Sequence, residues 1–246
     1  MKQVTLISLY GNKPENLETR IRECQDFLTK RIGVAFRPYD IRQVHATIIG
    51  LERCIGSAMQ NLNFWKKKSD ISKMDLAGLL NYFREAFAKG IEVQIGGFKN
   101  RDYGFISRHS IPYIRSFSIQ GDKVVVMGWP VCEAEYPDTL DEIRRVCQDY
   151  NVLHSYHDPV KTDRVDRDLY FRIGLVDPEA FSFAVGSKIE SELREKLAEN
   201  TTKITIRSED LYIAAYTDDT LPLDSSDCWS LANERVTGEF VENLYR

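Results

Sequence analysis

The stretch from Gln43 to Glu52 reads Gln-Val-His-Ala-Thr-Ile-Ile-Gly-Leu-Glu and has the composition of a β-strand. β-branched and apolar residues dominate it, and Gly50 ends the run. Because successive side chains of a strand point to opposite faces, His45 and Thr47 share one face. An imidazole and a hydroxyl held side by side on a rigid strand can grip and protonate an oxyanion. With four histidines in the chain, chance alone produces such a triplet about as often as not, so a second stretch has to support it.

Composition describes an ordinary folded chain. Its 246 residues, 43% hydrophobic and 28% charged, suffice for one large domain or two fused lobes. The net charge of -4 argues against a surface for long duplex DNA. The five cysteines are scattered without a Cys-x-x-Cys pair, so we expect neither disulfides nor a zinc site. No segment has the length of a membrane span or the character of a signal sequence, so we expect a cytoplasmic monomer that does not bind membranes.

Apolar spacing and capping residues predict the other elements. Strands are expected at Val4–Tyr10, Ile91–Ile95, Ile114–Ile119, Lys123–Gly128, Asp168–Leu175, Thr202–Ile206 and Leu211–Tyr216. Helices are expected at Pro14–Lys30, from a Ser72–Asp75 capping box to Gly90, at Asp138–Tyr150, and from Ser187 to Asn200. We interpret Phe64–Lys68, which is aromatic and basic, as a solvated loop in preference to a nucleic-acid contact. The polar stretch His154–Asp168 is interpreted as a surface loop.

The strand that begins at Asp168 is the counterpart of the first one. When Asp-Leu-Tyr-Phe-Arg-Ile-Gly-Leu-Val is laid over Gln-Val-His-Ala-Thr-Ile-Ile-Gly-Leu without a gap, Tyr170 falls on His45 and Arg172 on Thr47. Each strand follows a predicted helix and precedes another helix with further strands. This order predicts an α+β protein with an internal duplication.

These stretches resemble the motif strands of the two-histidine (2H) phosphoesterase superfamily, the RNA-ligase-like and cyclic phosphodiesterase proteins. The one specific motif is His45-Ala46-Thr47-Ile48. Over most of the chain the resemblance lies in the order of helices and strands. The resemblance implies a single bilobal domain over 1–246, with lobe-like halves of about 1–130 and 131–246. Two antiparallel sheets would line a central cleft, with helices outside. One histidine would act as base on a ribose hydroxyl or water and the other as acid on the leaving oxygen, with no metal or cofactor.

The sequence departs from the family in its second motif. We expect His45 and Tyr170 as the catalytic pair and Thr47 and Arg172 as the phosphate-binding pair. Tyrosine, with an unperturbed pKa of about 10, is a poor base but can donate a proton. Arginine holds a phosphate bidentately and with full charge. If His45 is the base, activity should fall as it protonates, near a pKa of about 6.5. His109, in a loop beside Arg108, could replace the missing histidine, although a plain surface residue is the commoner case.

One other histidine pair was weighed as a metal site. His154 and His157 are spaced three apart but lack a carboxylate at a diagnostic spacing, so we expect no metal. Two functions from different classes therefore stay open. The first is a (cyclic) phosphodiesterase acting on a nucleotide, cyclic nucleotide or RNA end. The second is a catalytically impaired nucleotide- or RNA-binding module, or an interaction protein, on the same fold. A third alternative is a structural protein in which His45 is a satisfied core histidine.

Overall fold

The computed structural model describes residues 2–54, 59–157, 165–180 and 182–245. In this part of the chain ten strands, all paired antiparallel, form one hydrogen-bonded sheet. Its main path has the order β10-β9-β1-β3-β7-β6-β4-β8, with β2 paired to β7 and β5 to β6. The strands are β1 Gln3–Ser8, β2 Phe36–Pro38, β3 Ala46–Gly50, β4 Ile91–Gly96, β5 Phe117–Gln120, β6 Lys123–Pro130, β7 Leu169–Val176, β8 Thr201–Ile206, β9 Leu211–Tyr216 and β10 Asp227–Ser230.

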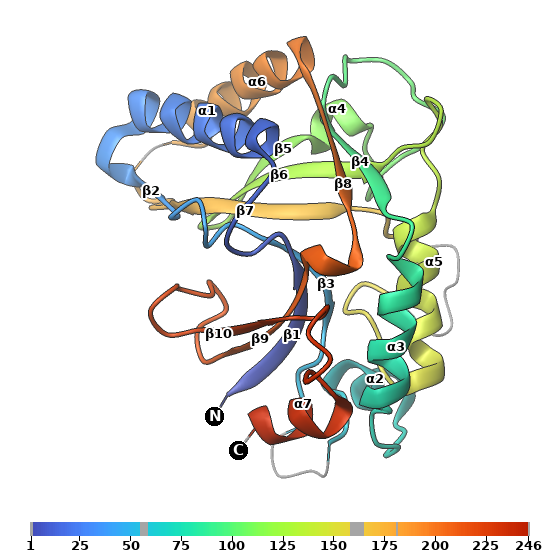
Figure 1. Ribbon diagram of the computed structural model, residues 1–246. Coiled ribbons are helices and arrows are strands. Elements are labelled where there is room, and N and C mark those ends of the chain that lie inside the picture. Colours follow the sequence, from blue (N-terminus) through green and yellow to red (C-terminus); the bar gives the residue numbers. More distant parts are fainter. Residues whose placement is uncertain (1, 55–58, 158–164, 181, 246) are drawn as a thin grey trace.

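Helices form two groups outside the sheet. Figure 1 shows α1 and α6 together above β5, β6 and β7, and α3 and α5 side by side at the right. The α-helices are α1 Glu15–Ile32, α2 Leu62–Lys68, α3 Leu76–Ala86, α4 Pro112–Arg115, α5 Thr139–Val146, α6 Phe183–Glu199 and α7 Gly238–Leu244. Short 3₁₀ turns are η1 Gly33–Ala35, η2 Cys147–Tyr150 and η3 Ser208–Asp210. The protein thus has the expected mixture of helices and antiparallel strands.

The two strands of the candidate site, β3 and β7, are neighbours in the middle of the sheet. They share a single residue pair, Ala46 with Phe171. Beyond β3 lie β1, β9 and β10, and beyond β7 lie β6, β4 and β8. Each flank therefore contains strands from both sides of residue 130, so neither flank corresponds to one half of the chain. The structure therefore has one continuous sheet, where two were expected, and its two flanks meet at this one pair.

A local twofold relation runs through that junction. The twofold axis of an antiparallel pair passes between the paired residues, so Ala46 corresponds to Phe171, and every β3 residue corresponds to the β7 residue 125 positions later. The β-bulges on the two strands are related by the same offset of 125 positions. The β1 register skips Ile48, and the β6 register skips Ile173, so both are left without a partner on these strands. Two bulges at corresponding positions give β3 and β7 the same local geometry.

Most predicted elements are present, but several differ from the expectation: Ile114 lies in helix α4 and not in a strand, and His45 lies directly before β3 and not within it. Phe64 lies in helix α2 and not in a loop, because the Asn61 side chain accepts a hydrogen bond from its backbone N–H at 2.9 Å and caps the helix. Helix α3 is capped by Asp75 alone, which accepts from Gly78. Helix α6 begins earlier than Ser187, with Ser182 as its cap. Such single-residue caps are weak signals beside the apolar periodicity.

Candidate functional site

The four motif side chains lie on one half-buried face of the central strands. On β3 and β7 the alternating residues Ala46 and Phe171 are fully buried in the main core. The residues on either side of these two are partly exposed: His45 and Thr47 next to Ala46, and Tyr170 and Arg172 next to Phe171. The antiparallel register sets Thr47 across from Tyr170, and it sets His45 across from Arg172. The structure thus brings together four residues from parts of the chain more than a hundred positions apart.

Hydrophobic clusters bound this face on both sides. Beside Thr47, β1 contributes Ile7, which is packed with Tyr10, Ala214 and Leu221. Beside Arg172, β6 contributes Val125 to a cluster with Phe98, Phe105, Met127 and Trp129, against which Tyr170 packs. Ile7 and Val125 occupy corresponding positions next to the two bulges. The four partly exposed polar side chains are therefore flanked by a buried apolar cluster on each side.

His45 is held as a neutral ring with a defined tautomer. Its Nδ1 lies 2.7 Å from the carbonyl oxygen of Gln43. Because a carbonyl oxygen only accepts, Nδ1 carries the hydrogen and Nε2 keeps its lone pair. Burial lowers the pKa of His45 to about 4 against the opposing effect of that hydrogen bond, and the charges of Arg172 and Lys13 lower it further. Near neutrality His45 is therefore an unprotonated base.

Arg172 and Tyr170 supply the charge and the phenol of the face. The Arg172 side chain is 18% exposed, and its ion pair is a long one, 3.4 Å to the exposed carboxylate of Asp219. An anion that offers a better geometry can replace such a partner. Burial raises the pKa of Tyr170, so this side chain stays a protonated phenol that can donate a hydrogen bond.

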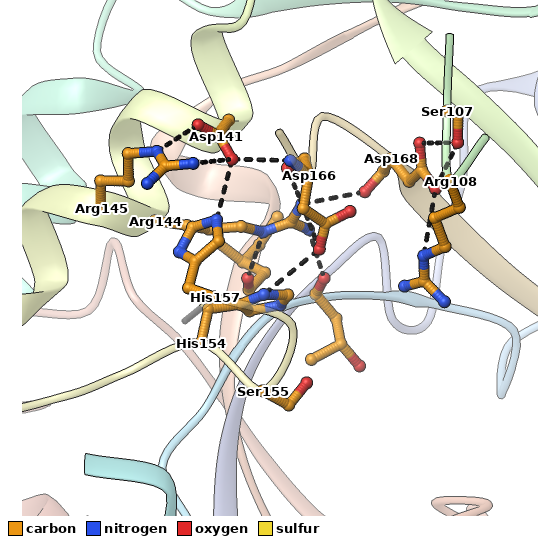
Figure 2. A network of polar contacts seen from close by, with 12 residues as sticks. Ser107, Arg108, Asp141, Arg144, Arg145, His154, Ser155, His157, Asp166 and Asp168 are labelled. Carbon is orange, nitrogen blue, oxygen red and sulfur yellow. Dashed lines mark hydrogen bonds and ion pairs between the residues drawn. The ribbon is translucent and has the colours of Figure 1, made fainter. Parts of the chain in front are cut away.

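His109 lies at the tip of a turn beside this face and is exposed. It is one of two residues between Ser107 and Ser110, which exchange backbone hydrogen bonds of 2.8 and 3.0 Å. Its neighbour Arg108 points toward Asp168, the residue directly before β7 (Figure 2). The turn thus adjoins the start of β7, and Arg108 is the side chain of the turn that reaches Asp168 there.

Two buried helix side chains hold β3 and β7 where they diverge. Arg144 of α5 donates to the carbonyl oxygens of Ile48 (2.9 Å) and Thr47 (3.2 Å), and on the other side to those of Asp166 and Asp168. Gln25 of α1 donates to the carbonyl oxygen of Ile173 at 2.9 Å. Ile48 and Ile173 are the bulged residues, and the Ile173 carbonyl also accepts from the backbone N–H of Tyr39 at 3.1 Å. The two helices thus satisfy corresponding backbone groups on the two strands.

Beneath the site lies a buried polar network that corrects one expectation. The stretch 154–168 was expected to be a surface loop, but its described ends are buried: His154 is 6% exposed and His157 only 1%. His157 Nε2 lies 2.8 Å from Asp141 Oδ1, and His154 Nδ1 lies 3.2 Å from Asp166 Oδ2 (Figure 2). Residues 158–164 of that expected loop lie outside the described residues. Each histidine therefore faces a carboxylate no more than 16 positions away in the sequence.

Arg144 and Asp168 are the important residues that sequence reasoning missed. A signal exists for Arg144, because it follows Ile143 within the apolar stripe of its helix, as Gln25 follows Cys24 in α1. A polar residue in an apolar stripe indicates a buried hydrogen-bonding role. Asp168 carries no such signal. Its partners are Ser107, Arg115 and the indole of Trp129, none of which is near it in sequence.

Comparisons with known proteins add little to this geometry. No family model matches the chain, and neither does any curated protein. The solved structures include a similar chain, the conserved protein of unknown function ATU0111 from Agrobacterium tumefaciens strain C58, at 13% identity and a TM-score of 0.41, covering 88% of this chain and 81% of that one. Nothing below rests on this likeness. Among the described helices, none combines the length and apolar character needed to cross a membrane.

Proposed function

We propose that this protein binds the phosphate of a nucleotide or RNA end on the face formed by His45, Thr47, Tyr170 and Arg172, in the manner of a 2H phosphoesterase. The observation that carries the proposal is the register of β3 and β7. The local twofold relates His45 to Tyr170 and Thr47 to Arg172, which is the same correspondence as in the gapless sequence alignment. A site built by two equivalent strands at a twofold junction is the arrangement that the resemblance implies.

We also infer a duplicated, bilobal architecture in which the halves of the chain exchange strands. The order β1–α1–β3–α3–β4 corresponds to β6–α5–β7–α6–β9, with β8 as an addition in the second unit. In the sheet, β4 lies in the flank of β7, whereas β9 lies in the flank of β3. The paired bulges and the paired contacts of Gln25 and Arg144 support this correspondence.

The chemistry of the face suits a phosphate. Arg172 offers several N–H donors in one plane and a full positive charge, and the Thr47 hydroxyl and Tyr170 phenol can add neutral donors. His45 is neutral in the free protein, so it accepts a proton from the ligand or from a water molecule. The side chains therefore favour an anion that carries donors of its own, as a nucleotide phosphate with its ribose hydroxyls does.

A second candidate function, hydrolysis of a 2′,3′-cyclic phosphate, is favoured by the tautomer of His45. Nε2 would take a proton from water as the water oxygen attacks phosphorus. The bond from phosphorus to one ribose oxygen would break, and that oxygen would take the phenol proton of Tyr170. The resulting phenolate and imidazolium would then exchange a proton to restore the site. The raised pKa of Tyr170 makes it a weak acid, so binding without turnover is the leading proposal.

Calorimetry and a turnover assay separate these functions. The ligands are adenosine 3′-monophosphate and adenosine 2′,3′-cyclic phosphate, and the proteins are the wild type, His45→Ala, Tyr170→Phe, Arg172→Ala and, as an exposed control, Arg22→Ala. We expect binding in the wild type and the control, and weakened binding in Arg172→Ala. Turnover that falls about 10²- to 10⁴-fold in His45→Ala would establish the enzyme. A wild type that binds neither ligand would refute the proposed function.

A further inference from the structure

The turn between Ser107 and Ser110 holds two residues in a backbone conformation that they rarely adopt. Arg108 has a φ of 44° and His109 a φ of 67°. In two-residue hairpin turns with positive φ at both positions, asparagine and glycine are usual, because other side chains are strained there. Strain of this kind persists where surrounding contacts fix the turn, and it is found at sites of function.

Asp168 provides that fixation. Its carboxylate accepts hydrogen bonds from Ser107 Oγ (2.6 Å) and from Trp129 Nε1 (2.7 Å), and Arg115 adds a charged donor at 3.2 Å. Figure 2 shows Ser107 and Arg108 reaching Asp168 from the same side. Because Asp168 directly precedes β7, the turn is locked to the strand that carries Tyr170.

The locked turn places Arg108 on an exposed tyrosine. The guanidinium carbon of Arg108 lies 3.6 Å from the centroid of the Tyr156 ring, and that residue is 50% exposed. Arg108 Nε lies 3.8 Å from Asp168, which Arg115 also pairs with, so one carboxylate faces two guanidinium groups. The Arg108 side chain stays 31% exposed. The turn also exposes Ile106, so the surface here is planar, cationic and partly apolar.

This surface adjoins the proposed phosphate site. Arg108 Nε lies 3.8 Å from Asp168, which precedes Tyr170 by two residues, and the charges of Arg172, Arg108 and Arg115 oppose the rise that burial gives the pKa of Tyr170. The phenol therefore lies within the electrostatic reach of both the phosphate-binding arginine and the Arg108–Tyr156 pair. A ligand anchored at Arg172 can extend past Tyr170 onto this pair.

We propose that Arg108, stacked on Tyr156, is a platform for the nucleobase of the ligand whose phosphate lies at Thr47 and Arg172. The proposal rests on the proposed function. Guanidinium planes and aromatic rings stack on nucleobases, because both offer a flat surface to the base. A second phosphate fits less well, since it needs the N–H edge of the guanidinium, and Arg108 Nε is directed to Asp168.

Calorimetry with two probes, inorganic phosphate and adenosine 3′-monophosphate, tests the platform in the full-length protein. We expect the wild type to prefer the nucleotide, and Arg108→Ala to lose about 5- to 150-fold of that preference, the range for stacking on one base. Phosphate affinity should stay within about twofold. Arg108→Lys keeps the charge but not the plane, so it should resemble Arg108→Ala. Arg101→Ala is the matched control, because Arg101 also lies over a tyrosine, Tyr103, in the same segment.

Arg108→Gly is the control that separates loss of the Arg108 side chain from loss of folding. Glycine relieves the positive φ, so this variant should fold and melt cooperatively while it loses the nucleotide preference. Equal affinity of the wild type for both probes, or an unchanged preference in Arg108→Ala and Arg108→Gly, would overturn the platform and leave the phosphate site standing. A wild type that binds neither probe would overturn the proposed function, and the platform with it.

Discussion

Burial decides how His45 behaves at different pH, and the carbonyl oxygen of Gln43 decides which nitrogen carries the proton. It fixes the proton on Nδ1, and burial then makes a second proton on Nε2 costly. The pKa of about 4 replaces the value of about 6.5 expected for an unperturbed histidine. If His45 is a catalytic base, activity in the free protein should stay constant down to about pH 5 and fall only near pH 4. An acid limb of kcat/KM near 6.5 would contradict this.

The same shift makes a prediction about stability. The unfolded chain binds a proton at His45 near pH 6.5, whereas the folded protein resists it until about pH 4. The contribution of His45 is therefore complete above pH 6.5 and is lost as the pH falls toward 4, by up to about 3 kcal/mol. Urea unfolding at several pH values should show a weaker acid destabilisation in His45→Gln. Parallel curves for both proteins would rule this out.

Arg172 carries the charge of the proposed phosphate site. Arg172→Ala should weaken binding of adenosine 3′-monophosphate by about 1.5–3 kcal/mol, the size of a hydrogen bond to a charged group. The free energy of unfolding of this variant should change little, because the ion-pair partner of Arg172, Asp219, is exposed. Calorimetry on this variant and on Arg22→Ala tests the assignment. Unchanged affinity in Arg172→Ala would remove Arg172 from the site.

At the scale of elements, the junction of β3 and β7 depends on side chains more than on strand pairing. The strands share one pair, and Arg144 then serves four carbonyl oxygens beside it. Arg144→Met should lower the free energy of unfolding by about 3–5 kcal/mol, because buried acceptors and the carboxylate of Asp166 lose their cation. Gln25→Leu removes a neutral donor and should cost about 1–3 kcal/mol. Equal losses in the two variants, measured by urea unfolding, would contradict this ranking.

These contacts also explain how far the sequence could be interpreted. His45, Thr47, Tyr170 and Arg172 were found because strand alternation places them on a common face, and the structure brings the four together. The role of Arg144 was missed, because its acceptors on β3, the carbonyls of Ile48 and Thr47, lie 96 and 97 positions away in the sequence. The burial of His154 and His157 was missed because their stretch is polar throughout, and its pattern does not show that Asp141 and Asp166 pair with the two rings. Local periodicity is visible in a sequence, whereas long-range polar pairing is not.

At the scale of the whole molecule, the pairing of β1 with β9 and of β4 with β8 makes the N-terminal and C-terminal parts of the chain interdependent. A cut at the exposed turn after Gly121 gives fragments 1–121 and 122–246. The second fragment then lacks β1, the partner of β9, and β4, the partner of β8. We expect neither fragment to unfold cooperatively alone, and the two to co-purify and regain a cooperative transition when expressed together. Cooperative unfolding of fragment 122–246 by itself would contradict this interdependence.

The pairing of β1 with β9 has a consequence during translation. Val4 is made 211 residues before its partner Ala215 (215 − 4). Until then β1 has only β3 beside it, and its other edge of backbone donors and acceptors is unpaired. Nascent chains with open strand edges are prone to associate with one another. Because β1 is completed only when β9 has been made, the growing chain carries an open strand edge while the intervening residues are synthesised, and over that interval it needs protection by chaperones.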